Sequence, residues 1–463
     1  MGRLLHPVAL AILAGALGCD PGGPVPDAAA PTDAAADGPS DAGSLDAAVA
    51  IDGAQGVDAA GDSGDAALAT DASQGEEDGG VLSVECEQAD DSAIPTDPAG
   101  VVTGAGAAAR QGGFVVAWTV VDGIESFIRA RLLDDCGVPE GDDIAVDISG
   151  LVVGVPVVAA VGGTDDFVIA WSREDVDGDG AGVVFQRFGP DGSAAGVEAV
   201  ANEVTFDDQI ATSAAALPAG FVVAWEDYSG AVLVRPDALL STFDETGRPM
   251  SGEIGISARP DGPQNLPLVA TASNGALLAA WSGDGVAMGR RRDEGGWTDA
   301  DGIALSDEPA LASGVAAGDD GFAVALQSDA DDAEGDVVLS LVDPAAGGAA
   351  LVTIAARTGA ERDPVVVRRA EGLLIAWTDE TYRDDPRAID SSGTTVMAAW
   401  TDEVGLIGEE PFVVPTTTEF DQELQAGAVG PSGVLLVWLD RSRADGEDGG
   451  GLRGRLVIQV DGQ

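Results

Sequence analysis

One short apolar pattern recurs along the chain from about residue 98. A glycine, alanine or acidic residue is followed by four apolar residues and then, in most copies, by tryptophan. The copies are GFVVAW ending at Trp118, DFVIAW at Trp171, GFVVAW at Trp225, ALLAAW at Trp281, GFAVAL at Leu326, GLLIAW at Trp377 and GVLLVW at Trp438. A continuous apolar run of this length predicts a strand buried on both faces. The copies recur roughly every fifty residues, which predicts seven repeats of one unit.

Three further strands are expected around each copy. A strand rich in small residues precedes it, as at 155–161, 210–216 and 266–272, and should lie innermost, where space is tightest. A third strand follows after an acidic loop, as at 182–189, and a short fourth strand comes next, as at 197–202. Four short strands per repeat describe one antiparallel blade. The predicted fold is therefore all-β, a seven-bladed β-propeller over residues 81–463.

The repeated tryptophans are interpreted as core residues that pack across to the next blade, with stacking on a sugar as the alternative. Trp400 lies outside the repeated pattern. It is expected at the position that Phe188 occupies in the second repeat, at the end of a third strand.

The two ends of the propeller region are expected to complete one blade together. The last repeat ends in RGRLVIQVDGQ, which supplies a third strand but no fourth, whereas VLSVECEQ at 81–88 is a strand without a repeat of its own. Pairing the two would close the ring and remove its free edges. Cys86 and Cys136 would then lie near the closing blade, so a disulfide between them is predicted, with two separate thiols as the alternative.

Composition narrows the chemistry. The chain has 80 acidic and 22 basic residues, a formal net charge of −58; every basic residue is arginine, and the one histidine is His6. Without a histidine in the propeller region or any lysine, a Ser-His-Asp triad or a Schiff base cannot form. Carboxylate pairs remain available. The negative charge repels nucleic acid and anionic membranes and attracts cations, above all calcium.

The N-terminus predicts export. Residues 1–18 have the positive start, short apolar run and small residues of a signal peptide, and Cys19 directly follows. This resembles a bacterial lipoprotein site, which implies a lipid on Cys19; an ordinary cleaved signal is the alternative. Residues 19–80 are rich in Asp, Ala, Gly and Pro, and residues 20–80 hold fourteen acidic and no basic residues. Such a tract is expected to be a disordered tether. The predicted location is the cell envelope or outer surface, where this lipid alone would attach the protein to the membrane.

The repeated pattern also carries a resemblance. GFVVAW, followed by an acidic loop and a strand such as VVFQRFGPDG, resembles repeats of bacterial exported proteins interpreted as β-propellers. It is loosely similar to the FG-GAP repeats of integrin-like propellers. This resemblance implies the architecture, and it leaves adhesin, scaffold and enzyme functions open.

One loop indicates a metal. Asp175, Asp177 and Asp179 match the D-x-D-x-D-G opening of a calcium loop, although Gln186 stands where a bidentate glutamate is usual. The predicted cofactor is calcium, and the alternative is a solvated hairpin. Further acidic loops at 328–336, 379–387 and 440–450 should emerge on the same face of the disc.

These observations favour a monomeric binding or scaffold module that presents an acidic face to a protein or glycan. The alternatives are a polysaccharide hydrolase with carboxylates near the centre and a structural role in the envelope. Arg290, Arg291 and Arg292 are the basic cluster considered for an anion contact, with a strand end that balances neighbouring acids as the preferred interpretation.

Overall fold

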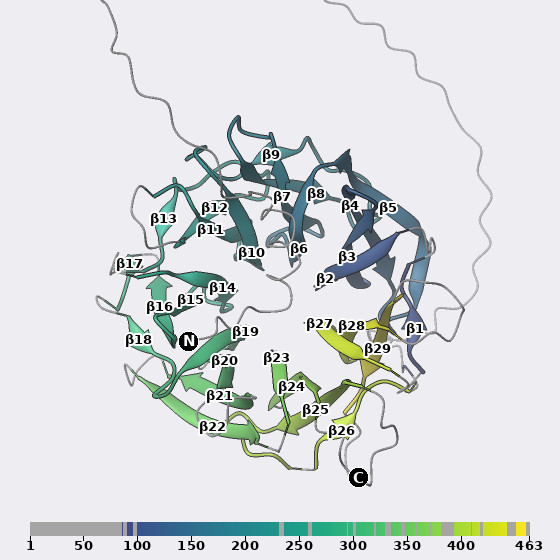
Figure 1. Cartoon of the computed structure of the whole chain (residues 1–463), viewed down its shortest axis with the longest axis vertical. Helices are drawn as coiled ribbons and strands as arrows, with labels where there is room; N and C mark the ends of the chain where they lie inside the picture. Colours follow the sequence, from purple (N-terminus) through teal and green to yellow (C-terminus); the bar gives the residue numbers. More distant parts are fainter. Residues whose placement is uncertain are drawn as a thin grey trace, which may run out of the picture. The chain divides into compact units, whose positions relative to one another are not determined.

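Seven four-stranded units form the part of the chain that the structure describes. The computed structural model describes residues 86, 90–95, 100–230, 236–257, 262–293, 295–299, 302–318, 321–328, 335–343, 348–356, 359–370, 372–380, 393–408, 410–416, 420–441 and 451–459. Its strands make seven antiparallel sheets, one of them with an additional short strand. The sheets stand around a common centre (Figure 1). The predicted all-β, seven-bladed β-propeller is confirmed.

The second strand of each blade is the repeated apolar pattern. These strands are β3 (Gly113–Asp122), β7 (Phe167–Glu174), β11 (Phe221–Asp227), β15 (Leu277–Gly283), β20 (Gly321–Ser328), β24 (Gly372–Asp379) and β28 (Val434–Asp440). Every residue from the first apolar position to the tryptophan or leucine is buried. The runs are continuously apolar because each strand has a neighbouring blade on both faces.

The first strands lie innermost, as the small residues predicted. They are β2 (Val101–Arg110), β6 (Val152–Ala160), β10 (Gln209–Ala216), β14 (Asn265–Thr271), β19 (Ala310–Gly318), β23 (Glu361–Arg369) and β27 (Gln422–Val429). Each pairs with the second strand of its blade through a register shift, such as the one between Ala211 and Ser213. A shift of this kind frees backbone groups from the ladder.

The third strands follow the acidic hairpins, and the outer strands are short in most blades. The third strands are β4 (Glu125–Leu133), β8 (Ala181–Phe188), β12 (Asp237–Phe243), β16 (Val286–Asp293), β21 (Asp336–Val342), β25 (Thr395–Thr401) and β29 (Gly451–Val457). The outer strands are β5 (Pro139–Gly150), β9 (Ala199–Val200), β13 (Ile254–Gly255), β17 (Gly296–Trp297) with β18 (Ile303–Ala304), β22 (Ala349–Ala355), β26 (Phe412–Val413) and β1 (Ser92–Ala93).

The glycine that opens the repeated pattern has a steric reason. Gly113 has φ 137° and Gly220 has φ 100°. A Cβ atom would stand 2.1 Å from the Leu133 carbonyl oxygen at Gly113, and 2.0 Å from the Phe243 carbonyl oxygen at Gly220. The third strand therefore passes too close for any other side chain, and the backbone needs a conformation that only glycine adopts easily.

Seven apolar clusters connect the blades into a ring. Each cluster contains residues from two neighbouring blades, and one of them joins the last blade to the first through Phe114, Trp118, Leu435 and Leu452. Within one strand the contacts alternate, so Val115 and Ala117 pack on the following blade. The core is thus a series of interfaces between blades, which explains why no blade can bury its apolar faces alone.

The repeated tryptophans pack on the preceding blade, and the predicted direction is wrong. Trp171 of the second blade lies with Ala130 of the first, and Trp225 of the third lies with Phe185 of the second. The six tryptophans are at most 4% exposed. Side chains along a strand alternate between its faces, so the face that the tryptophan occupies is fixed by the direction of the ring.

The closing strand lies further along the chain than predicted. The prediction that N-terminal residues supply the fourth strand of the last blade is correct, but the strand is β1, at Ser92–Ala93, paired with Arg453 and Gly454 of β29. The predicted strand at 81–88 lies outside the described residues except for Cys86, which is in no strand. Ile94, fully buried in the cluster between the last and first blades, explains the placement because it gives this segment a core residue.

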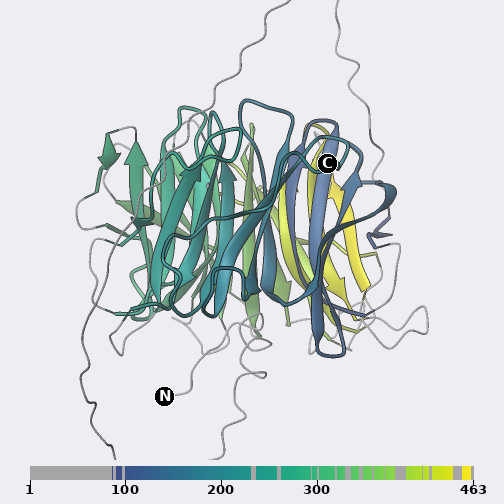
Figure 2. The same ribbon diagram turned by 90° about the horizontal axis from the view of Figure 1, so that it is seen from above.

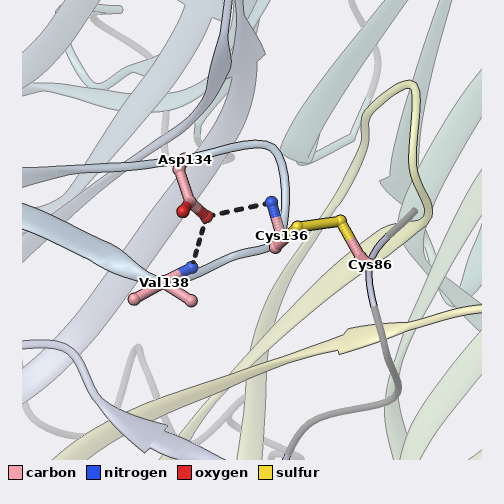
Figure 3. The surroundings of a disulfide bond; sticks show 4 residues. All are labelled: Cys86, Asp134, Cys136 and Val138. Atoms are coloured by element: carbon pink, nitrogen blue, oxygen red, sulfur yellow. Dashed lines mark hydrogen bonds between the residues drawn. A yellow bond between two sulfur atoms is a disulfide. The ribbon is translucent and has the colours of Figure 1, made fainter. Parts of the chain in front are cut away.

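A disulfide joins Cys86 to Cys136 beside this closure (Figure 3). Cys136 lies in the turn between β4 and β5, where the Asp134 carboxylate accepts hydrogen bonds from the backbone N–H groups of Cys136 and Val138. The following residue, Gly137, lies next to Leu435 and Leu456 of the last blade. The bond therefore attaches the segment before β1 to the first blade at the point where the ring closes.

Candidate functional site

The acidic hairpins between second and third strands lie at one end of the blades. In each blade this end also holds the start of the first strand, as the pairing of Gln209 with Asp227 shows. The connections between successive blades therefore reach the same face of the disc, and the strands run between this face and the opposite one (Figure 2). We call this end the hairpin face.

The predicted calcium hairpin packs against the link between the second and third blades. The Asp175 N–H donates to the Gly180 carbonyl and closes the turn. The Asp177 Oδ2 atom accepts a hydrogen bond of 2.6 Å from the Asn202 amide. From the link, the Asp208 carboxylate accepts a bond from the Ala181 N–H. Hairpin and link therefore hold each other in place.

A buried polar chain supports this contact from below. The Asn202 amide donates to Gln209 Oε1, and the Gln209 amide donates to Asp227 Oδ1 at 3.2 Å. Gln209 is fully buried and Asp227 is 6% exposed. Asp227 also accepts two bonds from Ser229. Buried polar groups with satisfied partners fix one arrangement, so the loops above them are preorganised.

The link at 203–208 presents an exposed aromatic ring. The Glu253 carboxylate of the third blade accepts hydrogen bonds from the N–H groups of Glu203 and Val204. Phe206 is nevertheless 60% exposed and Val204 is 38% exposed. Exposed carboxylates of Glu203, Asp207 and Asp208 belong to the same loop. We call residues 203–208 together with 175–180 the Phe206 surface.

The three aspartates of the predicted calcium site do not converge. Asp177 turns to Asn202, and the Asp179 carboxylate accepts a bond from the Asp207 N–H. Within the described ranges, no three carboxylate, histidine or cysteine side chains are grouped as metal ligands. Asp177 Oδ1 is the one sign of an absent partner, since it is a buried oxygen without a hydrogen bond. A calcium ion needs six or more oxygens, so this arrangement does not fit one without movement, and calcium stays a prediction.

Of the remaining predictions, only that of the arginine cluster falls on described residues throughout. The acidic loops at 328–336, 379–387 and 440–450 lie largely outside the described residues, as do residues 1–18, Cys19 and the tether at 19–80. In the arginine cluster, Arg291 forms a two-pronged contact with Asp299, and Arg290 lies over the Trp297 ring at 4.9 Å. Arg290 and Arg291 therefore have partners within the fold.

Hydrogen bonds also join neighbouring blades beside most of the repeated tryptophans. The sequence patterns did not predict these bonds. The residue after the tryptophan position bonds through its side chain to the backbone of the next first strand. The pairs are Thr119 with Gly154, Ser172 with Gln209 and Ala211, Glu226 with Leu266, Ser282 with Ala312, Gln327 with Asp363, and Thr378 with Leu424. These side chains bond beside the register shifts of the first strands. We call this contact the interblade bond; its sequence signal is the polar residue that follows the apolar run.

Glu226 is one of these residues, and its environment is unusual for a carboxylate. Its Oε1 atom accepts a bond of 2.7 Å from the Leu266 N–H, and Oε2 accepts one of 2.9 Å from the Tyr228 hydroxyl. Burial raises the pKa of Glu226 above its ordinary value of 4.5, and the two hydrogen bonds oppose this only in part. Burial and the nearby Glu226 charge also raise the pKa of Tyr228.

The hydrolase alternative requires a carboxyl group with a raised pKa. Glu226 has one, but its side chain takes part in contacts within the fold. Both of its oxygens accept hydrogen bonds from the protein, and it is 8% exposed. The other shifted carboxyl groups move the opposite way. For Asp147, burial would raise the pKa, but bonds from Ser149, Arg173 and Trp171 outweigh it and hold the pKa low. Glu226 is therefore explained by packing between blades.

Sequence patterns also missed a basic pair on the opposite face. Arg368 and Arg369 end β23, whose start at Glu361 belongs to the hairpin face. They line a hollow of about 480 Å³ together with Ala317, Gly318, Ala370, Glu403, Val429, Gly430 and Pro431. The signal available in the sequence was the charged ending of VVVRR, since the other first strands end in small or apolar residues except at Arg110.

Comparisons with known proteins give distant likenesses of fold. No protein-family model and no curated protein matches the chain. A protein of unknown function from Dyadobacter fermentans is 11% identical, with 81% of this chain and 99% of that chain covered and a TM-score of 0.44. An ulvan lyase is 10% identical, with coverage of 81% and 94% and a TM-score of 0.45. The Dos1 propeller is 10% identical, with coverage of 76% and 82% and a TM-score of 0.43.

The class is defined by the strands themselves. Seven antiparallel blades, closed by an N-terminal strand in the last blade, make the chain a seven-bladed β-propeller. Among the described residues, there is no helix with the length and apolar character to cross a membrane.

Proposed function

We propose that this protein is a binding module of the cell surface whose propeller captures a protein partner on the Phe206 surface. The observation that carries the proposal is Phe206, 60% exposed on a loop that buried hydrogen bonds hold in place. An ordered aromatic side chain loses little entropy on binding, and such residues dominate protein interfaces.

The charges around Phe206 favour one kind of partner. Glu203, Asp207 and Asp208 are exposed beside it, and Asp175 and Asp179 are exposed on the adjoining hairpin. An apolar residue surrounded by carboxylates would suit a patch of basic and apolar side chains on another protein. Carboxylates would repel an acidic glycan, so an acidic glycan is the less favoured partner.

Anchoring belongs to the same proposal. A lipid on Cys19 and the acidic tract at 19–80 would hold the propeller outside the membrane with its surface free to meet a partner. An extended, self-repelling tether gives the domain reach without fixing its orientation. Export followed by lipidation would also place Cys86 and Cys136 where disulfides persist.

The hydrolase is the less favoured alternative, because Glu226, the carboxyl group with a raised pKa, already accepts hydrogen bonds within the fold through both oxygens. That carboxyl group would act as a general acid only if a substrate displaced the Leu266 or Tyr228 bond. A Glu226→Gln variant that abolishes release of reducing sugar from a polysaccharide would favour the enzyme.

The test compares matched variants of the full chain. Wild type, Phe206→Ser and Ile124→Ser are immobilised and exposed to solubilised envelope proteins from the producing organism and, separately, to neutral and acidic glycans. Ile124 is the control because it is fully exposed in the first blade, in the hairpin that corresponds to residues 175–180. We expect one protein to be retained by wild type and Ile124→Ser, to be lost from Phe206→Ser, and to dissociate as salt rises. Equal retention by all three would contradict the proposal.

A further inference from the structure

We propose that the hollow around Arg368 and Arg369, on the face opposite the hairpins, binds the carboxylate of a small organic acid. The hollow measures about 480 Å³ and gathers the ends of three inner strands, β19, β23 and β27. Ligand sites commonly fall between about 300 and 1,000 Å³, so one or two sugar-sized rings would fit. This site is independent of the Phe206 surface.

Arg368 lines the hollow without an ion pair of its own. The guanidinium groups of Arg110, Arg187 and Arg291 each pair with a carboxylate, at 2.7–2.8 Å. In the part of the chain that the structure describes, Arg368 is in none of the ion pairs, and its Nε atom is buried without a hydrogen bond, as are those of Arg131, Arg187 and Arg362. Because the Nε atom is covered, a ligand oxygen in the hollow would bond to the Nη atoms of this guanidinium.

Gly318 makes room for that side chain. A Cβ atom at Gly318 would stand 2.4 Å from Arg368 Cδ and 2.5 Å from Nε. The arginine stem therefore lies directly on the backbone of the neighbouring blade. A side chain at position 318 would displace the Arg368 stem from this place beside the hollow.

Arg369 and Glu403 complete the polar lining. The Arg369 guanidinium lies 5.9 Å from the centre of the Trp400 ring, which supports its planar group from one side. Glu403 is the one acidic residue of the lining, so two positive charges face one negative charge. Two guanidinium groups match a carboxylate through paired N–H donors, and the Glu403 carboxylate can accept bonds from hydroxyl groups of the same ligand.

The negative charge of the whole chain does not prevent a carboxylate from binding in the hollow. The formal charge is −58, but screening at physiological salt acts beyond about 8 Å, so the lining decides the local sign. The acidic hairpins lie at the other end of the blades. An anion that the hairpin face repels would meet a positive site here.

The test is calorimetric titration of the full chain with sodium glucuronate, sodium succinate, glucose and sodium sulfate. Variants are Arg368→Gln, Arg368→Lys and Gly318→Ala, with Arg292→Gln as a control for loss of one positive charge. Thermal unfolding of each variant checks that it folds, and Arg368→Lys keeps the charge without the planar fork.

We expect saturable binding of a carboxylate and no binding of glucose. Arg368→Gln should weaken it at least roughly tenfold, Arg368→Lys and Gly318→Ala should weaken it less, and Arg292→Gln should match wild type. Glucuronate binding alone would identify a sugar acid as the ligand, and equal succinate binding a simpler acid. No saturable binding, sulfate binding of equal strength, or full affinity in a folded Arg368→Gln would overturn the proposal.

Discussion

At the scale of residues, the burial of the second strands explains the repeated apolar pattern. The apolar runs and their tryptophans could be predicted because burial on both faces leaves a continuous pattern. Trp400 could not be placed correctly. Phe188 pairs with Phe167, whereas Trp400 pairs with Leu374, one position further along the second strand. Its counterpart in the second blade is therefore Arg187, and Trp400 is only half-buried because it faces the other side of the strand.

The Glu226 carboxyl group should make stability depend on pH in a predictable direction. Its pKa is raised in the folded state, so its favourable contribution is complete below the unfolded value of about 4.5 and is lost as pH rises through the folded pKa. We expect Glu226→Gln to be more stable than wild type at neutral pH, with the difference shrinking toward pH 4. Urea unfolding of both proteins across this range measures it. A difference of the opposite sign, or one independent of pH, would contradict the account.

At the scale of elements, the third strand after each repeated apolar run could be predicted from the sequence. The interblade bonds could not. The polar residue after each tryptophan looks like an ordinary strand end in the sequence. Its role depends on the shifted register of a strand in the next blade, as for Thr378 and the Leu424 N–H at 3.0 Å. Such a contact involves two segments roughly fifty residues apart, which no local pattern contains.

Removal of one interblade bond should cost more than loss of a similar hydroxyl nearby. Thr378→Val leaves the buried Leu424 N–H without its acceptor, which should lower the free energy of unfolding by about 1–3 kcal/mol. Thr395→Val in the same blade is the control, because the Thr395 hydroxyl is buried and has no hydrogen-bond partner. We expect that variant to be neutral or slightly stabilised in denaturant titrations. Equal losses in the two variants would argue against the interblade bond.

The calcium prediction belongs to one hairpin and can be tested there. If calcium binds, it must draw Asp175, Asp177 and Asp179 together, because they do not converge without it. We expect calcium added to chelator-treated protein to release heat and raise the melting temperature, and Asp177→Asn to lose both effects. Asp122→Asn, in the corresponding hairpin of the first blade, should bind normally. Absence of heat in wild type would leave the hairpin as a protein-stabilised turn.

At the scale of the whole molecule, the ring and the number of blades followed from the repeats, but the position of the closing strand did not. A strand of two residues has no periodicity to detect, and its place depends on Ile94 entering a cluster between the last and first blades. The sequence predicted that the acidic hairpins and the links between blades share one face, and hairpin 175–180 and link 203–208 do lie together. Phe206 gave no signal, because its exposure depends on how the link between two blades is held.

Loss of the disulfide should loosen the ring at its closure. Cys86 and Cys136 are 50 residues apart, so the bond should contribute about 4 kcal/mol in the chain-entropy model. We expect a Cys86→Ser, Cys136→Ser double variant to unfold at lower denaturant concentration, with hydrogen exchange increasing first in β1 and β29. An unchanged midpoint would show that the apolar cluster alone closes the ring.

The central claim is that the Phe206 surface meets a protein partner in the native envelope. The most direct measurement is photocrosslinking on intact cells, with a photoreactive residue placed at Phe206 in one strain and at Ile124 in another. The account predicts one discrete protein adduct from position 206 and none from position 124. Identical adducts from both positions, or no adduct from 206 in a correctly exported protein, would contradict it.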